Sequence, residues 1–149
     1  MAEDTSGERQ YVVFRLGPET FGLDINKVKE IIIYQDTTRL PGAGRLIEGV
    51  INLRGHIIPI YALRKRFGFT AGTGAGITRI VVVEVRKSTV GIVVDGVSEV
   101  LMIPDSVMEK PSAIISAGVD ANYISGIAKT DEGLIIILDL ERVIESNIA

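Results

Sequence analysis

The chain has 149 residues with 16 Lys and Arg against 19 Asp and Glu, which gives a net charge of −3, and it has no cysteine. This length suits one domain or two very small ones, and the missing thiols exclude disulfides, thiolate catalysis and zinc–thiolate sites. The mild acidity argues against nucleic acid or an anionic membrane as the main partner. The polar N-terminus lacks a signal-peptide pattern, and no apolar run approaches the ~20 residues that span a bilayer, so we expect a soluble cytoplasmic protein.

The 22 Ile and 16 Val occur in short runs separated by Gly, Pro, Asp or Thr, which predicts a chain made mainly of β-strands. The second run should point Phe21, Leu23 and Ile25 inward. After a disordered tail over 1–9, the expected strands cover residues 10–16, 21–25, 30–34, two arms of a hairpin over 47–60, 79–85, 88–94, 97–102, 123–128 and 134–138. Short helices are expected over 63–67 and, at the C-terminus, 140–146, and a flexible Gly-rich loop over 71–76.

The hairpin over 47–60 is the most informative stretch, because two apolar strands meet across the polar hinge Asn52-Leu53-Arg54-Gly55. Gly55 can supply a turn position with positive φ at little cost. The hinge therefore holds Arg54, a long cation, at the lip of the hairpin. The plainer interpretation is that Arg54 is only a solvated turn residue.

The chain repeats itself, which indicates an internal duplication. Residues 21–31 recur at 90–100 with a shift of 69, residues 47–50 recur at 124–127 with a shift of 77, and residues 55–58 recur at 133–136 with a shift of 78. Each half, 10–70 and 77–149, offers about five strands, enough to close a small barrel. Some strands are apolar on both faces, so we predict two barrels packed face to face, and exchange of strands between the halves stays open.

Enzymatic chemistry finds little support in the sequence. His56 is the only histidine and is expected as an exposed turn residue, so a catalytic triad finds no support and a multi-histidine metal site cannot form; we expect no enzyme activity, cofactor or metal. Carboxylate-only catalysis stays open, although no paired acidic motif is present. The glycines at 72, 74 and 76 lack the Gly-Lys-Ser/Thr of a phosphate-binding loop and predict a flexible linker.

An ordered set of motifs over nearly the whole chain resembles the CheW family, adaptors that couple bacterial chemoreceptors to the histidine kinase CheA. The motifs are YVVFRL at 11–16, FGLDI at 21–25, VKEI at 28–31, LP at 40–41, IEGVINLRGHIIP at 47–59, VGIVVDGVSEVL at 90–101, YISGI at 123–127 and LIIILDL at 134–140. Two positions depart from the family pattern, which usually has proline at Gly44 and an acid near Ala62.

The resemblance implies a CheW-like domain over 10–149, built from two packed SH3-like five-stranded β-barrels with short helices. It implies a non-catalytic chemotaxis adaptor in the cytoplasm, associated with membrane chemoreceptor arrays, that supports array assembly and kinase control. The implied partners are the helical hairpin tip of a chemoreceptor (a methyl-accepting chemotaxis protein) and the CheA regulatory domain, itself a double barrel. The residues that match receptor-binding positions of the family are Val28, Glu30, Arg54, Val97 and Val100.

For the kinase we select the segment Thr37, Thr38, Arg39 and Leu40, which is otherwise a plain surface connection. Alternatives stay open for the receptor residues too, since any single valine can be a core residue and Glu30 can pair with a surface lysine. The competing function is a small-barrel nucleic-acid binder. The basic cluster Arg64-Lys65-Arg66 favours it, while the net acidity and the lack of clustered aromatic residues oppose it.

Overall fold

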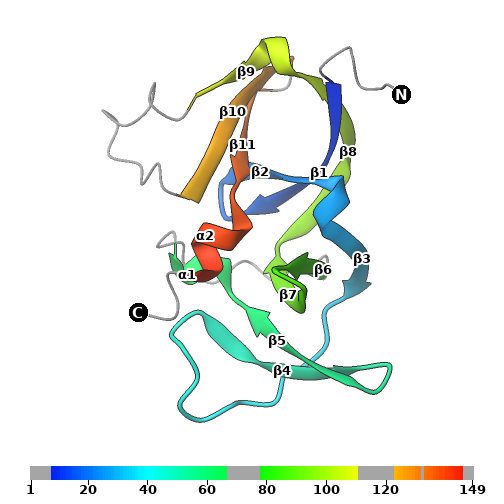
Figure 1. Cartoon of the computed structure of the whole chain (residues 1–149), viewed down its shortest axis with the longest axis vertical. Helices are drawn as coiled ribbons and strands as arrows, with labels where there is room; N and C mark the ends of the chain where they lie inside the picture. The colour runs from blue at the N-terminus through cyan, green and yellow to red at the C-terminus, as the bar shows by residue number, and fades with distance from the viewer. Residues whose placement is uncertain (1–7, 67–77, 111–122, 132, 146–149) are drawn as a thin grey trace.

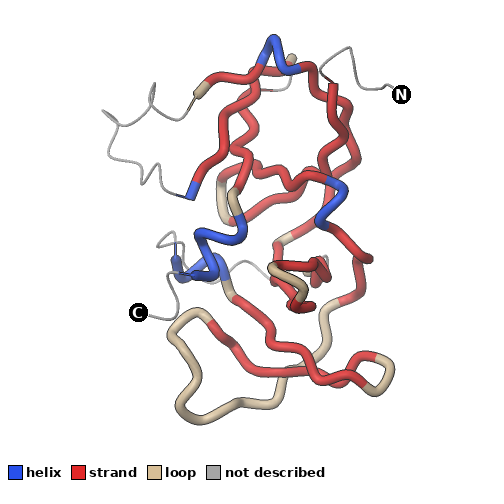
Figure 2. The backbone as a smooth tube through the Cα atoms, in the orientation of Figure 1, coloured by secondary structure: helices blue, strands red, loops and turns tan. Residues whose placement is uncertain are grey.

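The computed structural model describes residues 8–66, 78–110, 123–131 and 133–145. Strands dominate, as the Ile and Val content predicts (Figures 1 and 2). They are β1 (Glu8–Leu16), β2 (Glu19–Asp24), β3 (Val28–Ile33), β4 (Ile47–Leu53), β5 (His56–Tyr61), β6 (Arg79–Val85), β7 (Ser88–Val94), β8 (Gly96–Pro104), β9 (Met108–Glu109), β10 (Ile124–Thr130) and β11 (Gly133–Leu138). The short helices are the 3-10 turns η1 (Ile25–Lys27) and η2 (Asp105–Val107), with α1 (Leu63–Arg66) and α2 (Leu140–Glu145).

The strands form two sheets that we call barrel A and barrel B. Barrel A has the strand order β8-β1-β2-β11-β10-β9, and barrel B has the order β3-β6-β7-β5-β4. In Figure 2 barrel A is the ring at the top of the molecule, with barrel B below it. Each barrel takes strands from both halves of the chain, so a division into 10–70 and 77–149 does not coincide with the sheets.

Strand pairing preserves the internal repeat. Ile60 pairs with Gly91 in barrel B as Ile137 pairs with Gly22 in barrel A. The two hairpins close on Leu53↔His56 and Thr130↔Gly133, which are related by a shift of 77, so the shift of 78 expected for the second arm is wrong by one residue. The duplication therefore extends to the register of the sheets.

Gly22 and Gly91 are required for packing between a strand and its parallel neighbour. A Cβ at Gly91 would lie 2.6 Å from Ile60 Cδ1, and a Cβ at Gly22 would lie 2.9 Å from Ile137 Cδ1. Both distances are shorter than ordinary van der Waals contact. Glycine thus recurs at both positions because in each barrel an isoleucine side chain occupies the space that a Cβ would need.

The apolar side chains fill three layers, and this explains why several strands are apolar on both faces. In β6, Ile80 and Val82 fill the interior of barrel B, whereas Val81, Val83 and Val85 face a shared layer between the barrels. In β1, Tyr11 and Val13 fill barrel A while Phe14 and Leu16 join the shared layer. We call this layer the seam; it contains the stacked Phe14 and Phe21 rings, with centroids 6.0 Å apart.

Several element boundaries differ from those expected. β1 begins at Glu8, two residues before the expected start, and residues 1–7 and the loop over 71–76 lie outside the described part. Ile25 begins η1 instead of ending β2, because the Asp24 carboxylate accepts a hydrogen bond from Asn26 N at 2.9 Å and turns the chain. The sequence did not predict η2 or β9. Among the described helices, none has the length and apolar character needed to cross a bilayer.

Candidate partner-binding site

The turn between β4 and β5 aims Arg54 away from the hairpin. Arg54 and Gly55 both have positive φ, 52° and 88°, the pairing typical of a two-residue type I′ turn. Asn52 Oδ1 accepts a hydrogen bond from Gly55 N at 2.8 Å and holds the turn closed. The positive φ of Gly55 was expected, whereas the left-handed conformation of Arg54 was not, because arginine seldom adopts it.

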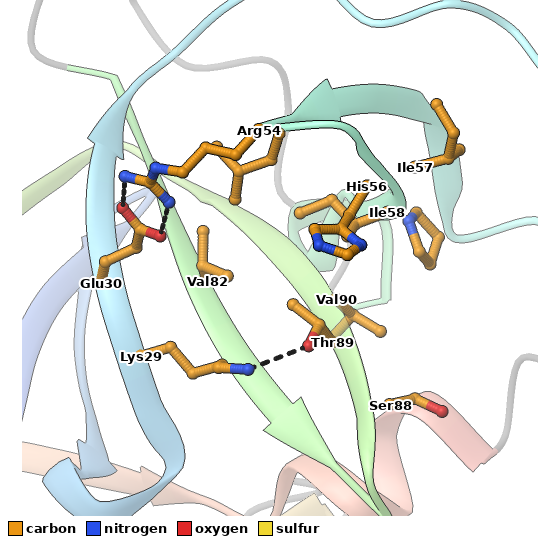
Figure 3. A pocket seen from close by; sticks show the side chains of 12 residues that line it. Lys29, Glu30, Arg54, His56, Ile57, Ile58, Val82, Ser88, Thr89 and Val90 are labelled. Atoms are coloured by element: carbon orange, nitrogen blue, oxygen red, sulfur yellow. Dashed lines mark hydrogen bonds and ion pairs between the residues drawn. The ribbon is translucent and has the colours of Figure 1, made fainter.

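Arg54 forms a two-pronged ion pair with Glu30 of β3 (Figure 3). Nη1 donates to Oε2 at 2.5 Å and Nη2 donates to Oε1 at 2.7 Å. These hydrogen bonds lower the pKa of Glu30 and raise the pKa of Arg54. The sequence indicated both residues but not their pairing, and the alternative that Glu30 pairs with a lysine is wrong.

The ion pair stands at the rim of a hollow of about 650 Å³ at the open end of barrel B. Lys29 Nζ donates to Thr89 Oγ1 at 3.2 Å across the same rim, and His56 is exposed there. Ile58 and Val82, both buried, lie beneath it. The rim is therefore polar and charged over an apolar base, an arrangement suited to protein recognition.

Apolar side chains are exposed on β3 and β8, the end strands of the two sheets. Figure 1 shows these strands on the same side of the molecule. The exposed fractions are 40% for Ile31, 72% for Ile33, 48% for Val100 and 55% for Met102. The shift of 69 relates Ile31 to Val100 and Ile33 to Met102, so the repeat supplies the same feature to both strands. We call these four side chains the apolar row.

The five predicted receptor-binding residues fall into three settings. Val28 and Val97 pack half-buried against the seam, which favours a mainly supporting role for both. Val100 belongs to the apolar row, while Glu30 and Arg54 stand at the mouth of barrel B. Sequence reasoning missed Ile31, Ile33 and Met102, although applying the shift of 69 to Val100 would have identified Ile31.

The segment predicted to bind the kinase lies in the connection between β3 and β4. Thr38 pairs with Val50 through two backbone hydrogen bonds of 2.9 and 2.8 Å. Thr37 Oγ1 lies 3.4 Å from a Glu48 oxygen that also accepts a hydrogen bond from the Tyr34 hydroxyl. The two threonines therefore hold the connection in place, and the next two residues, Arg39 and Leu40, are exposed.

Arg64, the first residue of the basic cluster behind the nucleic-acid alternative, is not a free cation. Arg64 Nη2 lies 2.8 Å from Asp95 Oδ1, and both side chains are only 20% exposed. Asp95 Oδ2 accepts a hydrogen bond from Gly17 N at 2.6 Å, so the pair fastens α1 of barrel B to the first turn of barrel A. The charge of Arg64 is thus already paired in a contact between the barrels. It is not available to bind phosphate groups, and this weakens the nucleic-acid interpretation.

Comparison with known proteins places this chain in a family. The family model described as "CheW-like domain" matches residues 10–147. The chain is similar to the chemotaxis protein CheW of Treponema pallidum, with 35% identity over 141 residues covering 92% of this chain and 82% of that protein. It is similar to the chemotaxis protein CheW of Klebsiella aerogenes, with 35% identity over 146 residues covering 98% and 87%.

A solved structure agrees with this fold. The scaffolding protein TtCheW from Thermoanaerobacter tengcongensis superposes with a TM-score of 0.83 and 39% sequence identity, and the match covers 92% of each chain. Two SH3-like barrels, as predicted from the family resemblance, are therefore the architecture of this chain.

Proposed function

The chain belongs to the CheW family of chemotaxis adaptors, and we propose that it couples chemoreceptors to the histidine kinase CheA without catalysing a reaction. The observation that carries this proposal is the apolar row, because exposed apolar side chains on two repeat-related strands on the same side of the molecule are available to a partner. In this role the protein works at the cytoplasmic face of membrane receptor arrays and supports their assembly.

The apolar row receives the helical hairpin tip of a chemoreceptor. An amphipathic helix binds through apolar side chains spaced along one face, and the exposed side chains of β3 and β8 offer matching contacts. Val28 and Val97 support the row from the seam, and the Glu30–Arg54 pair sets the orientation of the bound helix.

The kinase regulatory domain binds elsewhere, on the connection that contains Thr37, Thr38, Arg39 and Leu40. Thr37 and Thr38 contribute by holding the loop, and Arg39 and Leu40 contribute direct contacts. Two separate surfaces are what an adaptor needs, because receptor and kinase then bind at the same time.

Co-sedimentation with receptor-containing membranes and with full-length CheA tests this function. Ile33→Lys and Val100→Lys should each weaken receptor binding about tenfold, since a lysine in the contact loses water without gaining a partner. CheA binding should be unchanged. Leu134→Lys is the matched control, because Leu134 is 60% exposed on β11 and outside the apolar row. Equal losses for all three variants, or loss of both partners together, would contradict the two-surface adaptor.

The role of the ion pair needs a charge-swap experiment. Arg54→Ala should leave folding nearly intact, because exposed ion pairs add little to stability, but it should weaken receptor coupling. Arg54→Glu combined with Glu30→Arg restores the pair with reversed polarity. Recovery of receptor coupling in the double variant indicates that the pair orients the hairpin, whereas persistent loss indicates direct contact between Arg54 and the receptor.

A further inference from the structure

The two barrels carry opposite charge. Residues 28–66 and 78–94, which form barrel B with its connections, contain ten Lys and Arg against four Asp and Glu, a net charge of +6. Residues 8–24, 96–110 and 123–145, which form barrel A with its connections, contain five Lys and Arg against eleven Asp and Glu, a net charge of −6. A protein of small net charge is therefore strongly polarised, and its two ends favour partners of opposite sign.

Part of the positive charge of barrel B surrounds a hollow of about 810 Å³ between the β3–β4 connection and α1. Arg39, Arg45 and Lys65 line it, and all three are exposed. None of the three side chains has an ion pair or hydrogen bond to another residue within the described part of the chain. Five of the other cations in the described residues of barrel B have such partners: Lys29, Arg54, Arg64, Arg79 and Arg86.

The acidic groups nearby do not neutralise these cations. Among the described residues Glu48 is the only acid that lines the hollow, and one of its oxygens already accepts hydrogen bonds from Tyr34 and Thr37. Asp36 lies earlier in the same connection and is exposed, outside the lining. The lining therefore keeps a net charge of +2 that faces solvent.

The connection is held in shape before any partner binds. Ala43 N donates to Leu40 O at 3.1 Å in a turn completed by Gly42 at φ 81°. Ile47 N donates to Gly44 O at 3.1 Å, and Thr38 is paired with β4. Leu40, which is 50% exposed, is thus presented beside the cations at little cost in conformational entropy.

We propose that this surface docks a carboxylate-rich face of a partner protein, with Leu40 in apolar contact and Arg39, Arg45 and Lys65 facing acidic side chains. The inference rests on the proposed function and describes the partner's surface: the kinase contact should be acidic around a small apolar spot. Nucleic acid fits less well, because the described residues that line the hollow include no aromatic side chain for base stacking. A membrane fits less well, because a single exposed leucine offers little apolar area for insertion.

The test compares charge reversals at the hollow with one elsewhere on the same barrel. Arg39→Glu and Arg45→Glu should each lower the affinity for full-length CheA about tenfold, with a larger loss for the double variant. Lys87→Glu is the matched control, since Lys87 is an exposed cation in the β6–β7 turn, away from the hollow. Binding of the wild type should weaken clearly between about 50 and 200 mM salt, and binding of the double variant should respond much less.

Four results would overturn the proposal. The hollow variants could bind CheA within twofold of the wild type, or Lys87→Glu could lose as much affinity as they do. The double reversal could instead abolish binding to phosphatidylserine-containing vesicles or to duplex DNA while CheA binding persists. It could also abolish only self-association, measured by analytical ultracentrifugation, which would make a second copy the occupant.

Receptor binding serves as the internal reference and should be unchanged in every variant. Loss of receptor binding in a well-folded hollow variant would contradict the separate surfaces of the proposed function. If receptor binding persists and the charge reversals at the hollow leave the affinity for CheA unchanged, the adaptor function is retained and the acidic-partner inference is wrong.

Discussion

Barrel A and barrel B share their backbone plan but differ in how charge is distributed over it. Strand registers, a close contact between glycine and isoleucine on parallel strands, and an apolar interior next to the shared seam recur in both. The net charges of the two chain portions are nevertheless −6 and +6. In a close-packed core a change in side-chain volume of even one methylene group costs stability, so buried residues can change little. Exposed charged residues can be replaced with little effect on stability. A duplicated fold can thus keep one core and acquire two different binding surfaces.

The barrels also differ in how their open edges are closed. Barrel A uses the extra strand β9, which pairs with β10 and is joined to it by Lys129 and Glu109, 2.7 Å apart. In the described part of barrel B the same edge has the Thr38–Val50 bridge, supplemented by the side-chain contacts Tyr34–Glu48 and Glu30–Arg54. Barrel B therefore depends more on individual side chains at this edge, and this is the edge next to both proposed docking surfaces.

The largest expected difference concerns the equivalent glycines Gly49 and Gly126. A Cβ at Gly49 would lie 2.5 Å from the backbone oxygen of Thr38, whereas a Cβ at Gly126 would lie 3.0 Å from the flexible Met108 side chain and 3.1 Å from the backbone oxygen of Glu109. We expect Gly49→Ala to cost about 3 kcal/mol of the free energy of unfolding and Gly126→Ala about 1 kcal/mol. Urea unfolding of both variants measures the difference. Equal losses of unfolding free energy would mean that the backbone of the β3–β4 connection moves aside for the added Cβ without penalty.

The links between the barrels should differ next. Arg64→Ala removes the half-buried partner of Asp95 and should cost about 2 kcal/mol. Its repeat equivalent Glu141 pairs with Lys27 at 3.5 Å and Arg86 at 3.8 Å in exposed surroundings, so Glu141→Ala should cost less than about 0.5 kcal/mol. Thermal unfolding of the two variants measures both losses. A larger loss for Glu141→Ala would mean that the ion pairs of Glu141, and not the Arg64–Asp95 pair, are the stronger link between the barrels.

Closure of barrel B should depend on pH through Tyr34. Its hydrogen bond to Glu48 raises the pKa of Tyr34 to about 12, so the neutral form is favoured in the folded protein. This stabilisation is fully present below pH ~10 and is lost as the pH rises toward ~12. Tyr34→Phe should cost about 1–2 kcal/mol at neutral pH. Burial also raises the pKa of Tyr11, so an ultraviolet titration should show one late-ionising tyrosine fewer in Tyr34→Phe than in the wild type; an unchanged curve would contradict the assignment.

The smallest effect concerns the first residue before each α-helix. Asp139 caps α2 through its carboxylate, 3.4 Å from Arg142 N, while its repeat equivalent before α1 is Ala62. Ala62→Asp should therefore stabilise the protein by about 0.5–1 kcal/mol, and Asp139→Ala should destabilise it by a similar amount. Urea unfolding of the two variants gives both values, and a loss of stability for Ala62→Asp would show that the site cannot accept a carboxylate.

Much of the architecture can be predicted from local patterns in the sequence. Strands over 79–85 and 88–94 coincide with β6 and β7, because periodicity and turn residues act over a few neighbours. The duplication, the hairpin that presents Arg54 and the family membership were also predictable, since each depends on the order of residues along the chain.

Other features were decided only by the tertiary structure. Exchange of β1 and β2 into the sheet of β8–β11 depends on contacts distant in sequence, which local patterns do not encode. The pairing of Glu30 with Arg54 required the left-handed conformation of Arg54, and the exposure of Ile33 and Met102 depends on which strands end the sheets. Side-chain identity determines what a residue can do, but burial and partners arise only when distant strands pack together.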